Sequence, residues 1–169
     1  PPLHIKGRKL HGGEISVDAG ESSQYISALM MVTPRLESPL KINLRGNVTS
    51  QPYIRMTAEM MNRRGIRVEF ERDTIVIDNT PYGSYDSSAD LEPDWSAAAF
   101  WYEIAALTAG WVTLPGLRED SIQGDSGCRS LFEKLGVLTE FTDEGAELSA
   151  TPDLFSRLEA DMSDNPDLV

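Results

Sequence analysis

Hydrophobic and polar residues alternate along several short stretches of this chain, and such alternation is typical of half-buried β-strands. The clearest case places Leu40, Ile42 and Leu44 on one face of a strand, where they should contact a core. The predicted strands cover residues 3–10, 13–18, 40–45, 66–70, 74–77, 111–114, 137–141 and 146–150. Short turns join 66–70 to 74–77 and 137–141 to 146–150, which predicts two hairpins.

Four helices are predicted between these strands from start and stop signals around apolar runs. They run from about Ser22 to Pro34, from Thr49 or Ser50 to Gly65, from Asp94 to Ala109, and from Ser121 to Leu135. The first is apolar on nearly every side between Ile26 and Val32, so we expect it to be buried. Its polar N-terminus should then point at another group.

The order of these elements repeats along the chain. Ser96 follows Ser23 by 73 residues and Ser121 follows Ser50 by 71, and all four stand at predicted helix starts. A near-constant offset across several elements indicates a repeated supersecondary unit. The predicted fold class is therefore α/β (α+β), with repeated β-α-β-α-β-β units in two part-domains. Residues 79–93 are rich in turn formers, and we expect the chain to cross between domains there.

Composition and charge narrow the classes of partner. Of the 169 residues, 40% are hydrophobic and 25% charged, as in globular proteins, and the net charge of −12 opposes binding to nucleic acid or anionic membranes. No apolar run approaches the roughly 20 residues that cross a bilayer, and no secretion signal is present, so we expect a cytoplasmic protein. Cys128, His4 and His11 have no zinc-site spacing, and we expect neither a metal nor a cofactor.

The start of the first helix carries three polar side chains, those of Ser22, Ser23 and Gln24. The first backbone N–H groups of a helix lack internal partners, and the helix dipole is positive at this end, so a phosphate can bind there. The three side chains would add donors to such a site. The simpler alternative is that Ser22 or Ser23 only caps the helix.

Four motifs follow one another in a fixed order along the chain. They are Ser22-Ser23-Gln24-Tyr25 before an Ala-Leu-Met helix, Ser50-Gln51-Pro52-Tyr53-Ile54, Ser121-Ile122-Gln123-Gly124-Asp125, and Pro166-Asp167. Together they resemble the family of 5-enolpyruvylshikimate-3-phosphate synthase, also called 3-phosphoshikimate 1-carboxyvinyltransferase. The resemblance covers nearly the whole chain and a central segment of that enzyme. It implies that residues 1–90 belong to a shikimate-3-phosphate-binding domain and 91–169 to a second domain.

The resemblance also implies roles for individual residues. Those matched to shikimate-3-phosphate contacts are Ser22, Ser23, Gln24, Ser50, Tyr53 and Asp167. The three serines match positions that hold the 3-phosphate, while Gln24 matches one that contacts both this substrate and phosphoenolpyruvate. Tyr53 matches a residue packed against the shikimate ring. Asp167 matches a catalytic aspartate that contacts the reacting hydroxyl and acts in proton transfer, as suits a carboxylate.

The implied reaction moves the enolpyruvyl group of phosphoenolpyruvate to the 5-hydroxyl of shikimate-3-phosphate and releases phosphate. In the family, the lysine and arginines that clamp phosphoenolpyruvate and a catalytic glutamate would lie outside this chain. The chain lacks an initiator Met, and we expect it to be a piece of a longer, monomeric enzyme that is inactive by itself. Exposed sheet edges and apolar faces of this piece should favour self-association.

Several alternatives remain at this level. The related transferase acting on UDP-N-acetylglucosamine is disfavoured by the serine phosphate motif, and a non-catalytic α/β repeat module could use the same fold as a binding scaffold. The family usually has Gly-Asp and a serine pair at the third helix, whereas this chain has Pro93-Asp94-Trp95-Ser96-Ala97, so we expect Asp94 to be a helix cap. The carboxylates of Asp161, Asp164 and Asp167 are expected to be solvated rather than to bind a metal.

Overall fold

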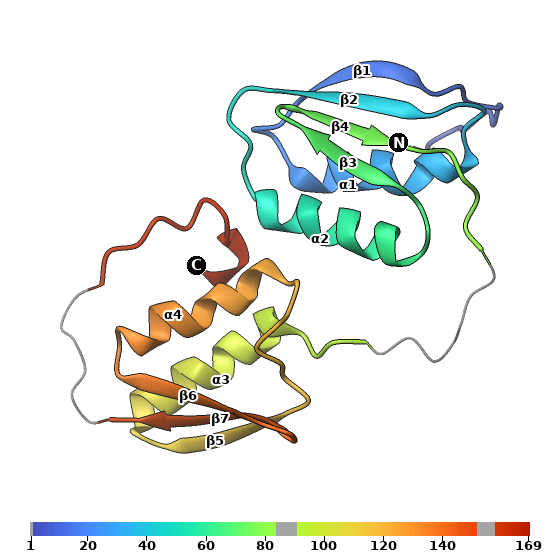
Figure 1. The fold of residues 1–169 in the computed structure, drawn as a ribbon. Coiled ribbons are helices and arrows are strands. Elements are labelled where there is room, and N and C mark those ends of the chain that lie inside the picture. Colours follow the sequence, from blue (N-terminus) through green and yellow to red (C-terminus); the bar gives the residue numbers. More distant parts are fainter. Residues whose placement is uncertain (1, 84–90, 152–157) are drawn as a thin grey trace. The chain divides into compact units, whose positions relative to one another are not determined.

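The chain folds as two compact units, Pro1–Tyr85 and Asp86–Val169, in a computed structural model that describes residues 2–83, 91–151 and 158–169 (Figure 1). Each unit has its own sheet, its own helices and its own buried core. The mixed α/β class predicted from the sequence is confirmed. No helix in these described ranges is long and apolar enough to span a membrane.

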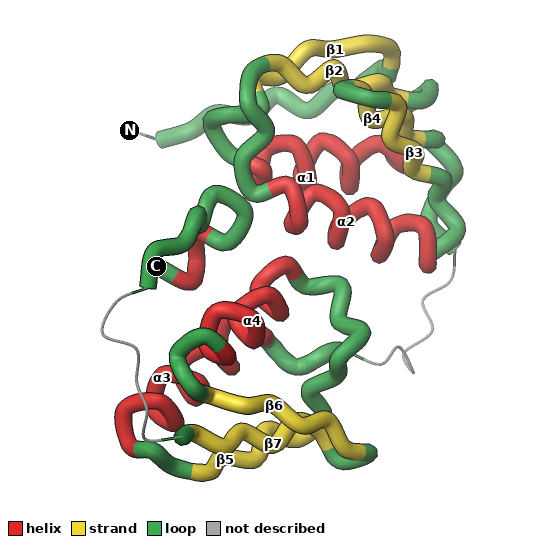
Figure 2. The backbone as a smooth tube through the Cα atoms, turned by 60° about the vertical axis from the view of Figure 1, so that its left-hand side comes forward, coloured by secondary structure: helices red, strands yellow, loops and turns green. Residues whose placement is uncertain are grey.

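The first unit is a four-stranded sheet with two helices on one face (Figures 1 and 2). Its elements are β1 (Gly13–Asp18), α1 (Ser23–Val32), a 3-10 turn (Thr33–Arg35), β2 (Leu40–Arg45), α2 (Gln51–Arg63), β3 (Val68–Glu71) and β4 (Thr74–Ile77). The strand order is β1-β2-β4-β3, in which β1 and β2 are parallel and the other neighbours are antiparallel. α1 is therefore a crossover between two parallel strands, and α2 leads into the β3–β4 hairpin.

The second unit is a three-stranded antiparallel sheet covered by two helices (Figure 1). Its elements are α3 (Trp95–Thr108), β5 (Trp111–Pro115), a 3-10 turn (Gly124–Gly127), α4 (Cys128–Glu133), β6 (Val137–Thr142), β7 (Gly145–Ala150) and a 3-10 turn (Pro166–Leu168). The strand order is β5-β7-β6.

The two sheets share one topology over three strands each. The order β2-β4-β3 in the first unit corresponds to β5-β7-β6 in the second. In both units, one strand (β2 or β5) leads through a helix to a hairpin. The second strand of that hairpin (β4 or β7) then pairs with the strand that came before the helix. This agreement supports the repeat inferred from the serine offsets. Within the described part of the second unit, no strand corresponds to β1.

The first core forms where the alternation of strand residues predicts it. Leu40 and Ile42 of β2 are 4% and 0% exposed, and Ile75 and Ile77 of the neighbouring strand β4 are both fully buried. Helix α2 adds Ile54, Ala58 and Met61, whose spacing places them on one side of the helix. Burial of this apolar area is the main force that holds the two helices against the sheet.

Helix α1 is less buried than its composition predicts. Ile26 and Met30, one turn apart, are fully buried, whereas Tyr25 and Met31 are 62% and 51% exposed. The helix lies on one face of the sheet beside α2, so within the first unit only the side toward these neighbours is covered (Figure 2). The expectation of a helix buried on nearly every side was therefore wrong.

Residues 3–10 form no strand, despite their loose alternation. Leu3 and Ile5 are 89% and 86% exposed. The first strand begins only at Gly13, whose N–H donates to the carbonyl of Pro39 at 2.8 Å. A strand needs a neighbour for its backbone hydrogen bonds, and alternation alone does not provide one.

The fourth helix begins later than predicted. Its first turn is a 3-10 turn that starts at Gly124, and α4 itself begins at Cys128 and ends at Glu133. Ser121 precedes these turns outside any helix or strand, and its hydroxyl donates to Glu92 at 2.5 Å and accepts from the Gln123 N–H at 3.1 Å. A carboxylate from a distant segment thus holds the serine that the sequence pattern assigned to a helix start.

Candidate functional site

Two helix N-termini lie at the same edge of the first sheet. β1 and β2 are parallel and in register, so that Asp18 at the end of β1 pairs with Arg45 at the end of β2. Each strand is followed by a short loop and a helix, α1 after β1 and α2 after β2. In consequence, both helices begin beyond the same ends of neighbouring strands, and they then run side by side (Figures 1 and 2).

Backbone hydrogen bonds hold the two loops together. The Ala19 N–H donates to the Arg45 carbonyl at 2.9 Å, and the Ala19 carbonyl accepts from the N–H of Thr49 at 3.3 Å. The Thr49 hydroxyl lies 3.4 Å from the same carbonyl. The Gly20 N–H donates to the Asp18 carboxylate at 2.9 Å, which closes the turn before α1. The position of one helix start is therefore fixed relative to the other.

The N-terminus of α1 presents the three polar residues of the first motif. Ser22 is the N-cap, and its hydroxyl accepts from the Gln24 N–H at 3.2 Å. Ser23 is the first residue of the helix and is 8% exposed, whereas Gln24 is exposed. The capping role that the sequence offered as an alternative is thus present for Ser22. The neighbouring backbone N–H groups of the first turn point out of the helix end.

The N-terminus of α2 is built on an unusual backbone. Ser50 occupies the N-cap position with φ 54° and ψ 37°, the left-handed region that few residues other than glycine adopt, and its side chain does not cap the helix. Pro52 follows in the first turn, where its missing N–H costs no hydrogen bond. Tyr53 is half-buried, and its N–H donates to the Ser50 carbonyl at 3.2 Å.

This edge of the first sheet has the chemistry of an anion site. It combines the positive ends of two helix dipoles, the first-turn N–H groups, the hydroxyls of Ser22, Ser23 and Ser50, and the amide of Gln24. Donors of this kind recognise a phosphate group even where the chain as a whole is acidic. Five of the six predicted substrate contacts, which come from two separate motifs, are brought together within the first unit.

The sixth predicted residue, Asp167, belongs to the second unit. It is exposed and lies in the 3-10 turn Pro166–Leu168. The side chain of Leu168, the next residue, packs against the core of the second unit. The turn that carries the carboxylate is therefore attached to a folded body.

The corresponding helix starts in the second unit are occupied by carboxylates. Asp94 caps α3, because its Oδ1 accepts from the N–H groups of Ser96 at 2.9 Å and Ala97 at 3.3 Å, as the sequence led us to expect. The Ser96 hydroxyl donates to Asp125 at 2.5 Å. Glu92 accepts from Ser121 in the same way. These serines match Ser23 and Ser50 in the repeat, and in the second unit the hydroxyls of both donate to protein carboxylates.

Sequence reasoning did not identify Glu92 or Asp125 as partners of these serines. Asp125 is 1% exposed, and it stands in the Gln-Gly-Asp part of the third motif. From the sequence alone, a carboxylate at the start of a helical segment is expected to be solvated or to cap the helix. The place of Asp125 in the third motif was the only sequence signal for a different role.

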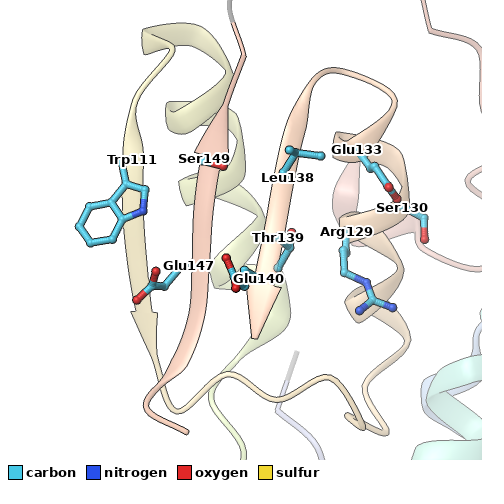
Figure 3. A pocket seen from close by; sticks show the side chains of 9 residues that line it. All are labelled: Trp111, Arg129, Ser130, Glu133, Leu138, Thr139, Glu140, Glu147 and Ser149. Atoms are coloured by element: carbon cyan, nitrogen blue, oxygen red, sulfur yellow. The ribbon is translucent and has the colours of Figure 1, made fainter. Parts of the chain in front are cut away.

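A hollow of about 470 Å³ lies elsewhere in the second unit (Figure 3). It is lined by residues of α4 and of all three strands, namely Trp111, Arg129, Ser130, Glu133, Leu138, Thr139, Glu140, Glu147 and Ser149. Three carboxylates against one guanidinium give it a negative lining, which does not suit a phosphate. None of the predicted substrate contacts lines this hollow. Among the residues that the structure describes, no group of three or more His, Cys, Asp or Glu could hold a metal ion.

The chain is similar to named proteins over 70% to 100% of its length. A 3-phosphoshikimate 1-carboxyvinyltransferase from Bacteroides fragilis (strain YCH46) is 42% identical over 171 residues, covering 100% of this chain and 41% of that protein. The protein of the same name from Pseudoalteromonas translucida is 34% identical over 146 residues, 85% of this chain and 34% of its own length. The pentafunctional AROM polypeptide of Eremothecium gossypii is 41% identical over 120 residues, 70% of this chain and 8% of its own length.

These relatives are longer than the chain, which spans about two fifths of the Bacteroides protein. Residues 1–169 match one family throughout, in agreement with the resemblance seen in the four motifs. The chain belongs to the EPSP synthase (3-phosphoshikimate 1-carboxyvinyltransferase) family.

Proposed function

We propose that this chain is part of a transferase that moves the enolpyruvyl group of phosphoenolpyruvate to the 5-hydroxyl of shikimate-3-phosphate, with release of phosphate. The observation that carries the proposal is the meeting of two polar helix N-termini at one sheet edge, with Ser22 and Ser23 on one and Ser50 on the other. The relatives that share this segment bear the name of that reaction, which lies on the route to aromatic amino acids.

Within this proposal, the first unit belongs to the domain that binds shikimate-3-phosphate. The hydroxyls of Ser22, Ser23 and Ser50 donate to the 3-phosphate, together with first-turn N–H groups. Gln24 is exposed at the same helix start and contacts both substrates through its amide, which can donate and accept. Tyr53, in the first turn of α2, packs its ring against the shikimate ring.

Asp167 has the catalytic role in this proposal. Addition of the 5-hydroxyl to phosphoenolpyruvate requires a base that takes the hydroxyl proton and an acid that protonates the methylene carbon. The carboxylate contacts the reacting hydroxyl and takes part in proton transfer. The second unit, which carries it, belongs to the other domain of the enzyme.

Calorimetric titration of the 169-residue chain with shikimate-3-phosphate tests the proposal. We expect binding that weakens about tenfold in Ser23→Ala, because a hydrogen bond to a charged group is lost. Ser16→Ala is the matched control, since Ser16 is an exposed serine of β1 in the same unit. Gln24→Glu should weaken binding further by placing a negative charge beside the phosphate.

The proposal fails if millimolar shikimate-3-phosphate does not bind, or if Ser23→Ala and Ser16→Ala bind equally well. Titration with UDP-N-acetylglucosamine distinguishes the related transferase, which would bind that nucleotide sugar instead. A chain that binds neither compound would be a scaffold module.

We also propose that the complete enzyme is a cytoplasmic monomer and that the 169-residue chain alone self-associates. Helix α3 supports the second point, because Phe100, Trp101 and Leu107 are 67%, 49% and 72% exposed. Phe100 and Leu107 are seven residues apart and so lie on one face of the helix, and exposed large apolar side chains on one face favour association. Light scattering of the isolated chain checks it, and a monomeric mass at all concentrations would contradict it.

A further inference from the structure

A buried carboxylate in the second unit joins two distant segments. Asp125 lies in the 3-10 turn before α4 and is 1% exposed. One of its oxygens, Oδ2, accepts from the Ser96 hydroxyl at 2.5 Å, and the other, Oδ1, accepts from the side-chain amide of Asn165 at 3.2 Å. A carboxylate taken out of water is stable only when such donors replace its hydration. Both contacts are therefore part of how the second unit holds this charge.

The amide of Asn165 belongs to the segment that carries Asp167. Asn165 directly precedes the turn Pro166–Leu168, and its carbonyl accepts from the Leu168 N–H at 3.1 Å. Its own N–H donates to the carbonyl of Met162 at 3.0 Å. The side chain of Leu168 packs against the core of the second unit. Asp167 thus lies between a polar anchor at Asn165 and an apolar anchor at Leu168.

We propose that Asp125 is a positioning residue for Asp167 and acts through Asn165. The inference rests on the proposed function, in which Asp167 transfers a proton. Catalysis is sensitive to displacements of the order of 1 Å, so the turn that carries the carboxylate has to be held in place. The bond from Asn165 to a buried charge fixes the start of the turn, while Leu168 fixes its end. Asp125 also contacts Ser96, which joins the same anchor to the first turn of α3.

An exchange of the two groups tests the anchor. Asn165→Asp places a second carboxylate against Asp125 and replaces the hydrogen bond by repulsion. In the double variant Asp125→Asn with Asn165→Asp, the new amide can donate to the new carboxylate while its carbonyl oxygen still accepts from Ser96. The pair is restored with its polarity reversed. Asp164→Asn, at an exposed position of the same segment, is the matched control for a carboxylate-to-amide change.

The first measurement is made on the 169-residue chain and is independent of catalysis. Backbone ¹⁵N relaxation of Asp167 and Leu168 should show a rigid turn in the unmodified chain and in Asp164→Asn. Asn165→Asp should make the turn mobile on the nanosecond timescale, and the double variant should make it rigid again. A turn equally rigid in all four chains would overturn the anchor, as would one that is mobile in the unmodified chain.

The second measurement uses the complete transferase that contains this segment. We expect Asn165→Asp to lower kcat by about tenfold to a hundredfold and to change the KM for shikimate-3-phosphate by less than about twofold, since five of the six proposed contacts to that substrate lie in the first unit. The double variant should regain most of kcat. A merely structural role would instead lower the yield of folded enzyme and leave kcat per folded molecule unchanged, which would overturn the positioning role.

Asp167→Asn in the same enzyme separates the two proposals. If Asp167→Asn is fully active, the assigned catalytic role fails, and the positioning role fails with it. If Asp167→Asn is inactive while Asn165→Asp has normal kcat, only the positioning role fails.

Discussion

The hydroxyl groups of Ser27 on α1 and Thr57 on α2 are hydrogen-bonded at 3.0 Å. Both residues are half-buried, and each lies within two turns of the N-terminus of its helix. The Thr57 hydroxyl also lies 3.0 Å from the carbonyl of Tyr53, one turn earlier on α2. This contact joins the two helices just behind the proposed phosphate site, so it couples helix packing to the placement of the phosphate donors.

Removal of the Thr57 hydroxyl should loosen this junction. Thr57→Val keeps the shape of the side chain but leaves the Ser27 hydroxyl without this partner, and we expect the first unit to lose about 1 kcal/mol of stability. Binding of shikimate-3-phosphate should weaken by about twofold to fivefold, corresponding to less than about 1 kcal/mol. Hydrogen exchange of the α1 and α2 amides together with calorimetry measures both effects. Thr113→Val, at an exposed position of β5 in the second unit, is the control and should change neither.

Two substitutions of Ser50 should separate the cost of its backbone conformation from its contribution to ligand binding. Its left-handed backbone costs about 1 kcal/mol for any residue with a Cβ, so Ser50→Gly should stabilise the first unit while Ser50→Ala should not. Both variants lack the hydroxyl, and both should bind shikimate-3-phosphate about tenfold more weakly. Ala109→Gly, which relieves a similar backbone at φ 48° in the second unit, should raise stability without any change in affinity. Unchanged affinity in both Ser50 variants would contradict the phosphate role.

The cap on α3 should contribute to stability and not to ligand binding. Asp94→Ala removes the acceptor for two first-turn N–H groups and should destabilise the second unit by about 1 kcal/mol, whereas Asp94→Ser should retain most of the stability. All three tryptophans, Trp95, Trp101 and Trp111, lie in the second unit, so urea unfolding followed by tryptophan fluorescence reports on that unit. Equal destabilisation by Ala and Ser would argue against capping.

Cys128 should make the second unit sensitive to alkali. The side chain is fully buried, and burial raises the pKa of its thiol from 9.0 to about 12. Below pH 9 the thiol is protonated in both the folded and the unfolded chain. As the pH rises from 9 toward 12, the unfolded chain loses this proton while the folded chain keeps it, so the free energy of unfolding falls.

Cys128→Ala should flatten this decline, although the smaller side chain lowers stability at every pH. Burial also raises the pKa of Tyr102 to about 12. The part of the decline above pH 10 that Tyr102 causes therefore remains in Cys128→Ala. Urea unfolding followed by tryptophan fluorescence, repeated at pH values from 8 upward, measures how steeply the free energy of unfolding falls with pH. A Cys128 thiol that reacts with a thiol reagent in the folded chain would contradict the burial from which the prediction follows.

Local sequence patterns identified most of the secondary structure. Strand β2 has the predicted bounds, the β3–β4 and β6–β7 hairpins turn at the predicted places, and Asp94 caps α3. These features depend on backbone periodicity and on the chemistry of a few adjacent residues, which the sequence displays directly. The failures at residues 3–10 and on the outer side of α1 arose because a pattern does not show which surfaces have a neighbour.

The sequence by itself also determined the family, because the order and spacing of the four motifs are properties of the chain alone. Only the tertiary structure decided which polar groups meet. Ser22 and Ser50 lie at one sheet edge because β1 and β2 pair in parallel, and Asp125 contacts Asn165, 40 residues later, because residues 158–169 reach the 3-10 turn before α4. Contacts of this kind depend on packing between distant segments, where the gain from burial selects one arrangement among many that the local pattern allows.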